Sequence, residues 1–284
     1  MAKICYDNKS DNAPIKLDNL KHFYYIDERG AIKIIEAIRI LDGYIFKQHT
    51  IDAANLAYQE FEKLCNSYKP NVRDRYLPLI NMRLRTFVLE FRVYLEHWEK
   101  HIKHENTAYE LFKKLTSDAY DHNDEYVLVY GLRNFAAHID NLINYTFAGQ
   151  DNGVFEPLIS RSALLEHKDA FNTKTVSIID HYDTEAIHLR SIMTKSIKLL
   201  NDIHNKMMAF YLNQEVIDAA KIMGEAYNVI KRKRIHANRW FYIEFENLYI
   251  MCQNSYNDIC YPNGNGFSSK YIDWERYTSI NTTN

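Results

Sequence analysis

The sequence has few of the residues on which loop-rich or disulfide-stabilised proteins depend. Glycine (8) and proline (5) are scarce among its 284 residues, so we do not expect a disordered or loop-dominated chain. The four cysteines are far apart and form no CxxC pair, which argues against a disulfide scaffold or a zinc ribbon: Cys5, Cys65, Cys252 and Cys260. Unpaired cysteines suit a reducing compartment, so we expect a cytoplasmic protein.

Long apolar runs and a surplus of one charge are also missing. No stretch approaches the ~20 apolar residues that a membrane span requires, and Met1-Ala2-Lys3-Ile4 does not begin a signal-peptide pattern. We therefore expect no membrane partner. The formal net charge is −2, whereas a protein that holds nucleic acid by bulk electrostatics would be basic. Any contact with RNA must then use a local patch.

Helical periodicity is what the chain has in abundance. Apolar residues recur at steps of three and four, the spacing of helices with one buried face. Asp42-Gly43 is expected to stop or kink the first helix. Pro78 either lies in the first turns of the third helix or separates a short helix from it. The sequence predicts a mainly α protein, a multi-helix bundle, with helices over 32–41, 51–68, 71–104, 107–120, 125–145, 184–212 and 216–230.

The expected organisation has three parts. Residues 1–16 are polar and form a flexible N-terminus in this prediction, followed by a helical domain over 17–150. Residues 151–284 form a mostly helical C-terminal region, which either is a separate domain or completes the first one. The strongest turn signal, Ala-Gly-Gln-Asp-Asn-Gly at 148–153, suggests the boundary between them.

Two short segments after residue 150 have strand character, namely 154–159 and 175–179. They predict a small β insert in the otherwise helical chain. The segment from Arg239 onward is aromatic and fits either a strand or a helix, and residues 280–284 are expected to be disordered.

Residues 133–138, within the helix expected over 125–145, read Arg-Asn-Phe-Ala-Ala-His. Successive helical residues advance by about 100°, so Asn134 and His138 lie about 40° apart, on nearly one face. The long side chain of Arg133 can curve back toward them. Arginine offers a planar cationic fork to phosphate oxygens, and histidine exchanges a proton near neutral pH. The three residues therefore form a compact set for phosphodiester chemistry.

The line from Asn134 to His138 extends in both directions as a polar stripe. Its further members, Tyr130, Asn141 and Tyr145, are candidate site-lining residues. A helix facing a core does not need such a stripe beside its apolar one. The pattern indicates a face that meets a ligand, solvent or a partner helix, although an arginine and a histidine that pin helices together would have the same spacing.

This arrangement resembles the HEPN superfamily of α-helical nucleotide-binding and ribonuclease domains. The family signature is an arginine, usually followed by Asn, Asp or His, with a histidine four to six residues after the arginine. Arg133, Asn134 and His138 match it in order, and a compatible helical framework covers about 71–148. Arg92 and His97 repeat the Arg-x4-His spacing, but a valine follows Arg92, so we treat that copy as coincidence.

The resemblance implies metal-independent RNA cleavage that needs no cofactor. His138 would act as general base or acid, Arg133 would stabilise the charged transition state, and Asn134 would orient the histidine or a phosphate oxygen. The product would be a 2′,3′-cyclic phosphate. Family members usually dimerise through this helix, so a homodimer is implied. A microbial defence or toxin role, with an antitoxin or regulatory partner, follows from the same resemblance; the alternative is a non-catalytic nucleotide-binding or regulatory module.

A second candidate lies near the end of the last expected helix. Lys231, Arg232, Lys233 and Arg234 form the strongest basic cluster, and an aromatic run, Trp-Phe-Tyr, follows at 240–242. Cations beside stacking surfaces suit single-stranded RNA. The cluster would equally fit a solvated helix end, where the dipole favours positive charge.

Two further groups of titratable residues have both a chemical and a purely structural interpretation. His97, His101 and His104 have the helical spacing of metal ligands, but their segment is highly charged and resembles a solvated face, so no metal site is expected. The group at 180–188 fits a hydrolytic cluster or the acidic start of a helix: Asp180, His181, Asp183, Glu185 and His188.

Overall fold

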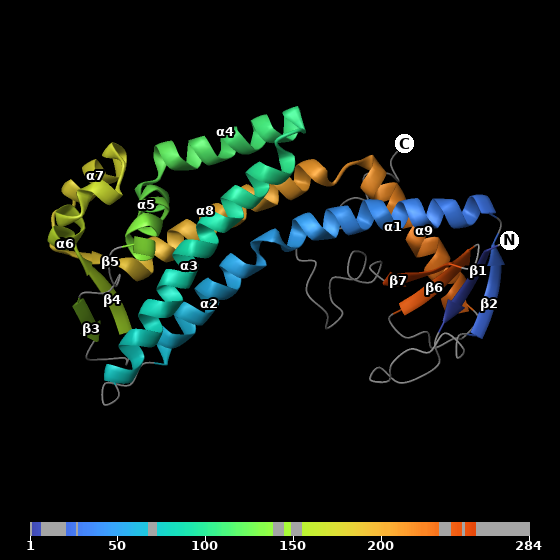
Figure 1. Cartoon of the computed structure of the whole chain (residues 1–284), viewed down its shortest axis with the longest axis horizontal. Helices are drawn as coiled ribbons and strands as arrows, with labels where there is room; N and C mark the ends of the chain where they lie inside the picture. The colour runs from blue at the N-terminus through green and yellow to red at the C-terminus, as the bar shows by residue number, and fades with distance from the viewer. Residues whose placement is uncertain are drawn as a thin grey trace, which may run out of the picture. The chain divides into compact units, whose positions relative to one another are not determined.

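The computed structural model describes residues 2–6, 21–26, 28–67, 73–138, 145–148, 155–232, 240–245 and 248–253. The mainly α fold with a small β insert is confirmed (Figure 1). The helices are α1 (Glu28–Gln48), α2 (Asp52–Asn66), α3 (Arg73–Ile102), α4 (Asn106–His122), α5 (Asp124–His138), α6 (Arg161–Glu166), α7 (Thr173–Asp180), α8 (Leu189–Tyr211) and α9 (Gln214–Arg232), with short 3-10 turns η2 (His49–Ile51) and η4 (Lys168–Ala170). The strands are β1 (Ala2–Tyr6), β2 (Lys21–Ile26), β3 (Tyr145–Ala148), β4 (Phe155–Ser160), β5 (Ala186–His188), β6 (Trp240–Phe245) and β7 (Leu248–Gln253).

The chain divides into two compact units, and the divisions fall at different positions from the boundary expected near 149–153. Residues 48–210 form one unit, and residues 1–47 together with 211–284 form the other. The turn signal at 148–153 lies inside the first unit, where β3 before it pairs antiparallel with β4 after it. Glycine and asparagine are common both in the turns of β-hairpins and in linkers between domains. The sequence signal therefore does not distinguish a hairpin turn from a domain boundary.

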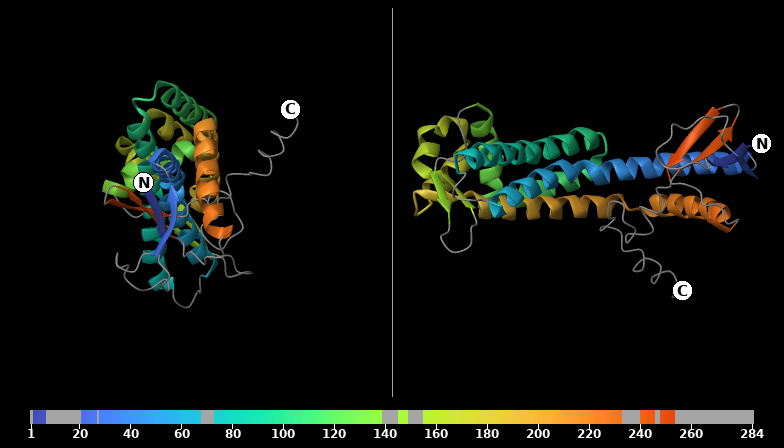
Figure 2. Two further views of the ribbon diagram at one scale, coloured as in Figure 1. Left: turned by 90° about the vertical axis from the view of Figure 1, so that its right-hand side faces the viewer. Right: turned by 90° about the horizontal axis from the view of Figure 1, so that it is seen from below.

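The core of the unit 48–210 is built from α2, α3 and α8, which run side by side (Figure 2). The buried residues of α2 follow helical spacing: Ala54, Ala57, Phe61 and Cys65. The largest buried side chains of α3 are aromatic: Phe87, Phe91, Tyr94 and Trp98. Two hydrogen bonds from the guanidinium of Arg190 to the carboxylate of Glu62, at 3.0 and 2.7 Å, join α8 to α2. None of the described helices is long and apolar enough to cross a membrane.

Helices α4 and α5 pack on α3 through aromatic rings. Phe112 of α4 stacks on Trp98, with ring centroids 6.2 Å apart. Tyr126 of α5 meets Phe91 edge-on at 5.1 Å. The hydroxyl of Ser196 on α8 donates to the carbonyl of Glu125 at 2.9 Å, so α5 is held from a second side. These contacts fix the helix that carries the Arg-Asn-x3-His motif.

The small β insert is a three-stranded antiparallel sheet in the order β3-β4-β5. The strand expected over 154–159 is confirmed as β4, whereas the strand expected over 175–179 is wrong, because those residues belong to α7. The Asn172 side chain caps this helix by accepting from the backbone N–H of Thr175 at 2.9 Å. Thr175 and Ile179 are buried one turn apart. A short β-branched run is compatible with the period of a strand and with that of a helix. Here the N-terminal cap from Asn172 favours the helix.

The other unit contains α1, α9 and a four-stranded antiparallel sheet in the order β2-β1-β6-β7. The flexible N-terminus expected over 1–16 is wrong for residues 2–6, which form β1 between β2 and β6; residues 7–16 lie outside the described residues. Gly43 does not stop its helix, since α1 continues to Gln48. The ambiguous aromatic segment forms β6 and β7, and residues 280–284 are outside the described ranges.

Candidate functional site

Helix α5 begins immediately after α4. Asn123, between the two helices, donates from its side-chain amide to the carbonyl of Ala119 at 3.0 Å, and its backbone carbonyl accepts from the N–H of Val127. Asp124 and Glu125 place negative charge in the first turn, where the helix dipole favours it. The helix ends at His138, earlier than the expected end at residue 145.

The early end of α5 corrects the predicted polar stripe. Tyr145 is the first residue of β3, paired with Leu158, so it does not continue the helical line from Asn134 and His138. Its side chain and the whole of Asn141 lie outside the described residues. The sequence Tyr-Thr-Phe-Ala favours a strand once a partner strand is present, and β4 supplies that partner.

Arg133 and Asn134 contact each other on the last turns of α5. Nη1 of Arg133 donates to Oδ1 of Asn134 at 3.1 Å, and Nδ2 of Asn134 donates to the carbonyl of Ala170 at 3.4 Å. Asn134 is exposed and Arg133 half-buried. His138 is the last helical residue, one turn after Asn134; its side chain lies outside the described residues. The guanidinium and the amide are therefore adjacent and reachable from solvent.

Gly131 lets the segment 167–175 approach the motif closely, and sequence analysis missed it. A Cβ at this position would lie 2.6 Å from Cγ2 of Thr175 and 3.3 Å from Cδ1 of Phe171. The Phe171 ring stacks on Phe135, with centroids 6.0 Å apart and planes 12° from parallel. A glycine inside a predicted helix was the available signal, because it often marks a close approach of another element.

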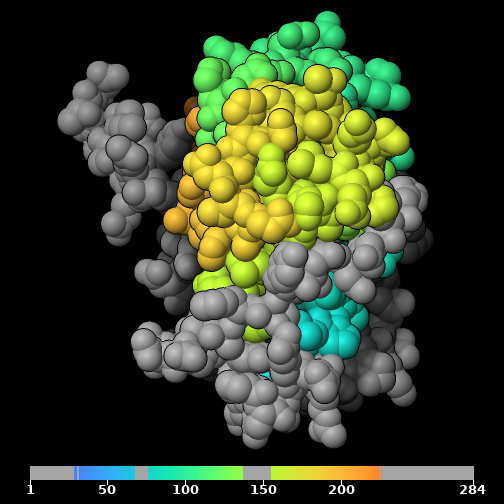
Figure 3. Space-filling view, turned by 90° about the vertical axis from the view of Figure 1, so that its left-hand side faces the viewer, coloured from blue at the N-terminus to red at the C-terminus, as the bar shows by residue number. Residues whose placement is uncertain are grey.

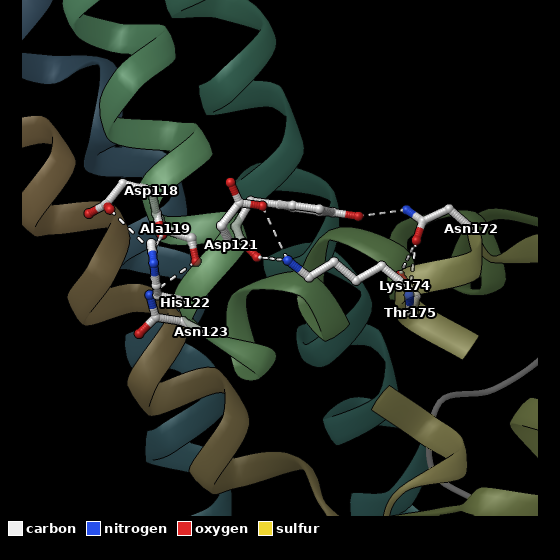
Figure 4. A network of polar contacts seen from close by, with 9 residues as sticks. Asp118, Ala119, Asp121, His122, Asn123, Asn172, Lys174 and Thr175 are labelled. Atoms are coloured by element: carbon white, nitrogen blue, oxygen red, sulfur yellow. Dashed lines mark hydrogen bonds and ion pairs between the residues drawn. The ribbon is translucent and has the colours of Figure 1, made fainter. Parts of the chain in front are cut away.

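Polar contacts secure the start of α7 against the end of α4 (Figure 4). Nδ2 of Asn172 donates to the Tyr120 hydroxyl at 2.9 Å, and Nζ of Lys174 donates to the Tyr120 carbonyl at 2.8 Å and to Asp121 at 3.3 Å. Figure 3 shows α6 and α7, in yellow, gathered on one face of this unit below α4, in green. The Ala170 carbonyl that meets Asn134 is thus held by a well-connected segment.

Tyr130, the candidate site-lining residue one turn before Asn134, lies at a pocket of about 340 Å³. The guanidinium carbon of Arg92 is 4.4 Å from the centroid of its ring, and the Tyr120 ring meets it edge-on at 5.8 Å. Asn172 also lines this pocket. The pocket and the motif therefore share α5 and the segment around residues 170–172.

Two of the three histidines singled out near the end of α3 lie in ring contact. The rings of His97 and His101 are 4.2 Å apart, and burial together with the neighbouring His101 and Lys100 lowers the pKa of His97. Within the described ranges, no three side chains of His, Cys, Asp or Glu are placed to hold one metal ion. Nearby Glu99 pairs with Lys113 of α4, as expected for a charged, solvated face.

The group at 180–188 serves local structure. Arg161 donates to the carboxylate of Asp180 at 2.8 Å, and Glu185 accepts from the hydroxyls of Ser160 and Ser162, which lower its pKa. Nδ1 of His181 lies at the Ser177 carbonyl. The expected acidic helix start is wrong, because β5 intervenes and α8 begins at Leu189.

The basic cluster can be located only in part. Lys231 and Arg232 end α9, with side chains outside the described residues, and Lys233 and Arg234 lie wholly outside them. Comparison of the chain with protein-family models, with curated proteins and with solved structures gives no match.

Proposed function

We propose that this chain is a metal-independent endoribonuclease in which Arg133, Asn134 and His138 act on the scissile phosphate. The observation that carries the proposal is the 3.1 Å hydrogen bond from Arg133 to Asn134, with His138 one turn further along the same helix. The bond sets a guanidinium beside an amide at an exposed position. A fork of N–H donors that is held in place binds phosphate oxygens without further ordering of its side chain.

The chemistry that fits these groups is transesterification within RNA. His138 takes the proton of a ribose 2′-OH, the 2′-oxygen attacks the adjacent phosphorus, and the bond from phosphorus to the 5′-oxygen breaks. The products are a 2′,3′-cyclic phosphate and a 5′-OH end. Arg133 stabilises the extra negative charge on the pentacoordinate phosphorus. One histidine performs one of the two proton transfers, so a second copy of the chain would supply the other in a homodimer.

The biological setting is part of the same proposal. A metal-independent ribonuclease in a microbial cytoplasm suits a defence or toxin role, and such an enzyme needs restraint by an antitoxin or another regulatory protein. Lys231, Arg232, Lys233 and Arg234 would guide RNA in a chain that carries a net charge of −2.

The experiment compares the parent chain with His138→Ala on expression in a bacterial host. Growth is followed, and total RNA from each culture is examined for new 2′,3′-cyclic phosphate ends. His97→Ala is the matched control, because it removes a histidine from the other Arg-x4-His copy. Purified protein with total RNA, with and without EDTA, tests the metal independence.

We expect new cyclic-phosphate ends with the parent and with His97→Ala, with EDTA making no difference, and their loss with His138→Ala. Cleavage by His138→Ala at the parent's rate would show that the site assignment is wrong. Cleavage that stops in EDTA would exclude the proposed mechanism.

A second candidate function is a non-catalytic nucleotide-binding or regulatory module that uses the same face. One observation favours it: the Asn134 amide is engaged within the chain on both sides, by Arg133 and by Ala170. Such a closed set of contacts is typical of side chains that hold elements together. Nucleotide binding that depends on Arg133, with no new RNA ends from purified protein, would support this function over cleavage.

A further inference from the structure

Cleavage of an RNA strand needs two proton transfers, and the proposed function assigns one of them to His138. The second transfer protonates the 5′-oxygen as its bond to phosphorus breaks. A second copy of the chain is one source of that proton. His167, an exposed histidine of the same chain, is another, and the position of its segment against α5 favours it.

His167 belongs to the segment that contacts the motif. It stands directly before η4, where its backbone carbonyl accepts from the N–H of Ala170 at 2.9 Å. The carbonyl of Ala170 in turn accepts from Nδ2 of Asn134 at 3.4 Å. Two hydrogen bonds and one residue therefore separate the backbone of His167 from the Asn134 amide, a path of roughly 10 Å at most. His167 and the pair of Arg133 and Asn134 can thus contact the same dinucleotide step.

The direction of this segment brings His167 to the end of α5 where His138 lies. Phe171 meets Gly131, with Cδ1 3.3 Å from the position of a Cβ there, whereas the ring of His167 meets Phe135 edge-on at 5.8 Å. The segment 167–171 therefore advances along α5 toward its last residue as the numbering decreases. His138 follows Phe135 by three residues, so the two positions are about 60° apart on one side of the helix.

His167 has the properties that a proton donor to a substrate requires. Its side chain is exposed, so RNA can reach it, and a histidine exchanges protons near neutral pH. Its backbone N–H donates to the carbonyl of Leu164 at 3.2 Å, and its ring rests against the buried ring of Phe135. These contacts hold the residue beside α5. By contrast, His122 and His181 each bond within their own helix.

We propose that His167 is the general acid of the cleavage reaction, an assignment that rests on the proposed ribonuclease function. His138 takes the proton of the 2′-OH, and the 2′-oxygen forms its bond to phosphorus. The bond from phosphorus to the 5′-oxygen breaks, and its electron pair stays on that oxygen. The imidazolium of His167 gives this oxygen its proton, so one histidine gains a proton and the other loses one. Each chain then carries both proton-transfer groups, without a histidine from a second copy.

The test compares two RNA substrates of one sequence. In the second, sulfur replaces the 5′-oxygen at the bond that the parent cleaves. A thiolate is a good leaving group without protonation, so cleavage of this bond does not need the general acid. Rates are measured for the purified full-length parent, His167→Ala and His138→Ala. His122→Ala is the control, because it removes an exposed histidine of α4. Thermal melting shows that each variant is folded.

We expect His167→Ala to cleave ordinary RNA about 10²-fold or more slowly than the parent, the usual contribution of a general acid. On the RNA that contains sulfur, its rate should come within about threefold of the parent, because that bond breaks without the acid. His138→Ala should remain slow on both substrates, and His122→Ala should match the parent. His167→Ala and His138→Ala, co-expressed, should stay inactive on ordinary RNA, because neither chain carries both groups.

Cleavage of ordinary RNA by His167→Ala at the rate of an active parent would overturn the assignment and leave the proposed function intact. An equal loss on both substrates would show that His167 supports the structure and is not the acid. Restored activity on co-expression would place the two histidines on different chains, contrary to a site within one chain. If the parent cleaves neither substrate, the proposed function itself is wrong, and the assignment falls with it.

Discussion

The side-chain amide of Asn134 on α5 lies 3.4 Å from the carbonyl oxygen of Ala170, just before α7, while its own oxygen accepts from Arg133 at 3.1 Å. One amide thus joins the arginine of the motif to a neighbouring segment. An amide suits both roles because it donates from one end and accepts at the other. The two contacts can be separated by substitution.

Asn134→Asp keeps an acceptor for Arg133 and removes the donor to Ala170, whereas Asn134→Ala removes both. If the contact with Arg133 matters for catalysis, the aspartate variant should cleave RNA at a rate close to the parent, and the alanine variant roughly tenfold or more slowly. Initial rates on one labelled RNA measure this. Equal loss in both variants would assign the role to the contact with Ala170 instead.

Arg133→Lys tests whether the planar fork matters beyond its charge. Loss of an oriented donor to a developing negative charge costs roughly 10²–10³ in rate, so we expect the lysine variant to remain at least about tenfold below the parent, with Arg133→Ala lower still. Arg85→Lys, an exposed arginine on α3, is the control. Full activity of Arg133→Lys would mean that a point charge suffices.

Gly131→Ala should loosen the packing of α7 against α5. Its new Cβ would lie 2.6 Å from Cγ2 of Thr175, a buried side chain whose hydroxyl is bonded to Asn172. Overpacking of this kind costs about 1–3 kcal/mol, partly offset by about 1 kcal/mol of helix propensity. Urea denaturation measures the change in the free energy of unfolding.

Thr175→Ser, combined with Gly131→Ala, tests whether the clash involves Cγ2 of Thr175. Serine keeps the hydroxyl and lacks Cγ2, so in the Gly131→Ala background it should restore part of the lost stability. Additive destabilisation in the double variant would show that the clash is not with that methyl group.

Local pattern explains what could be predicted from the sequence. The long helices were predictable because apolar residues such as Phe87, Phe91 and Trp98 recur with helical spacing over α3. The adjacency of Arg133 and Asn134 is likewise local. By contrast, β1 pairs with β6, more than two hundred positions away, and no local signal in residues 2–6 reveals that partner.

The surroundings of the motif depend on such distant contacts. The carbonyl of Ala170 carries no side-chain signature, and the pocket at Tyr130 combines residues of α3, α4 and α5 with Asn172. The end of α5 was misplaced because helical periodicity continues past His138 in the sequence, whereas pairing with β4 makes a strand of residues 145–148.

A buried histidine gives the unit 48–210 a pH-dependent stability. The Tyr94 hydroxyl lies 3.4 Å from Nδ1 of His204, and the rings of Tyr94 and Trp98 surround the imidazole at 5.9 and 6.1 Å. Burial lowers the pKa of His204 from 6.5 to about 4. The folded protein therefore keeps this side chain neutral at a pH where the unfolded chain protonates it.

The direction of the effect follows from proton binding. Between pH 6.5 and about 4 the unfolded chain binds the proton and the folded one does not, so stability is present above pH 6.5 and falls as the pH is lowered. The full loss in the free energy of unfolding that this histidine causes is about 3 kcal/mol, at 1.36 kcal/mol for each pKa unit. Urea denaturation of the parent should give a smaller free energy of unfolding at pH 5 than at pH 7.5. His204→Phe should flatten that slope, whereas His122→Ala, at an exposed position on α4, should leave it unchanged. An equal slope in His204→Phe would show that other groups cause the pH dependence.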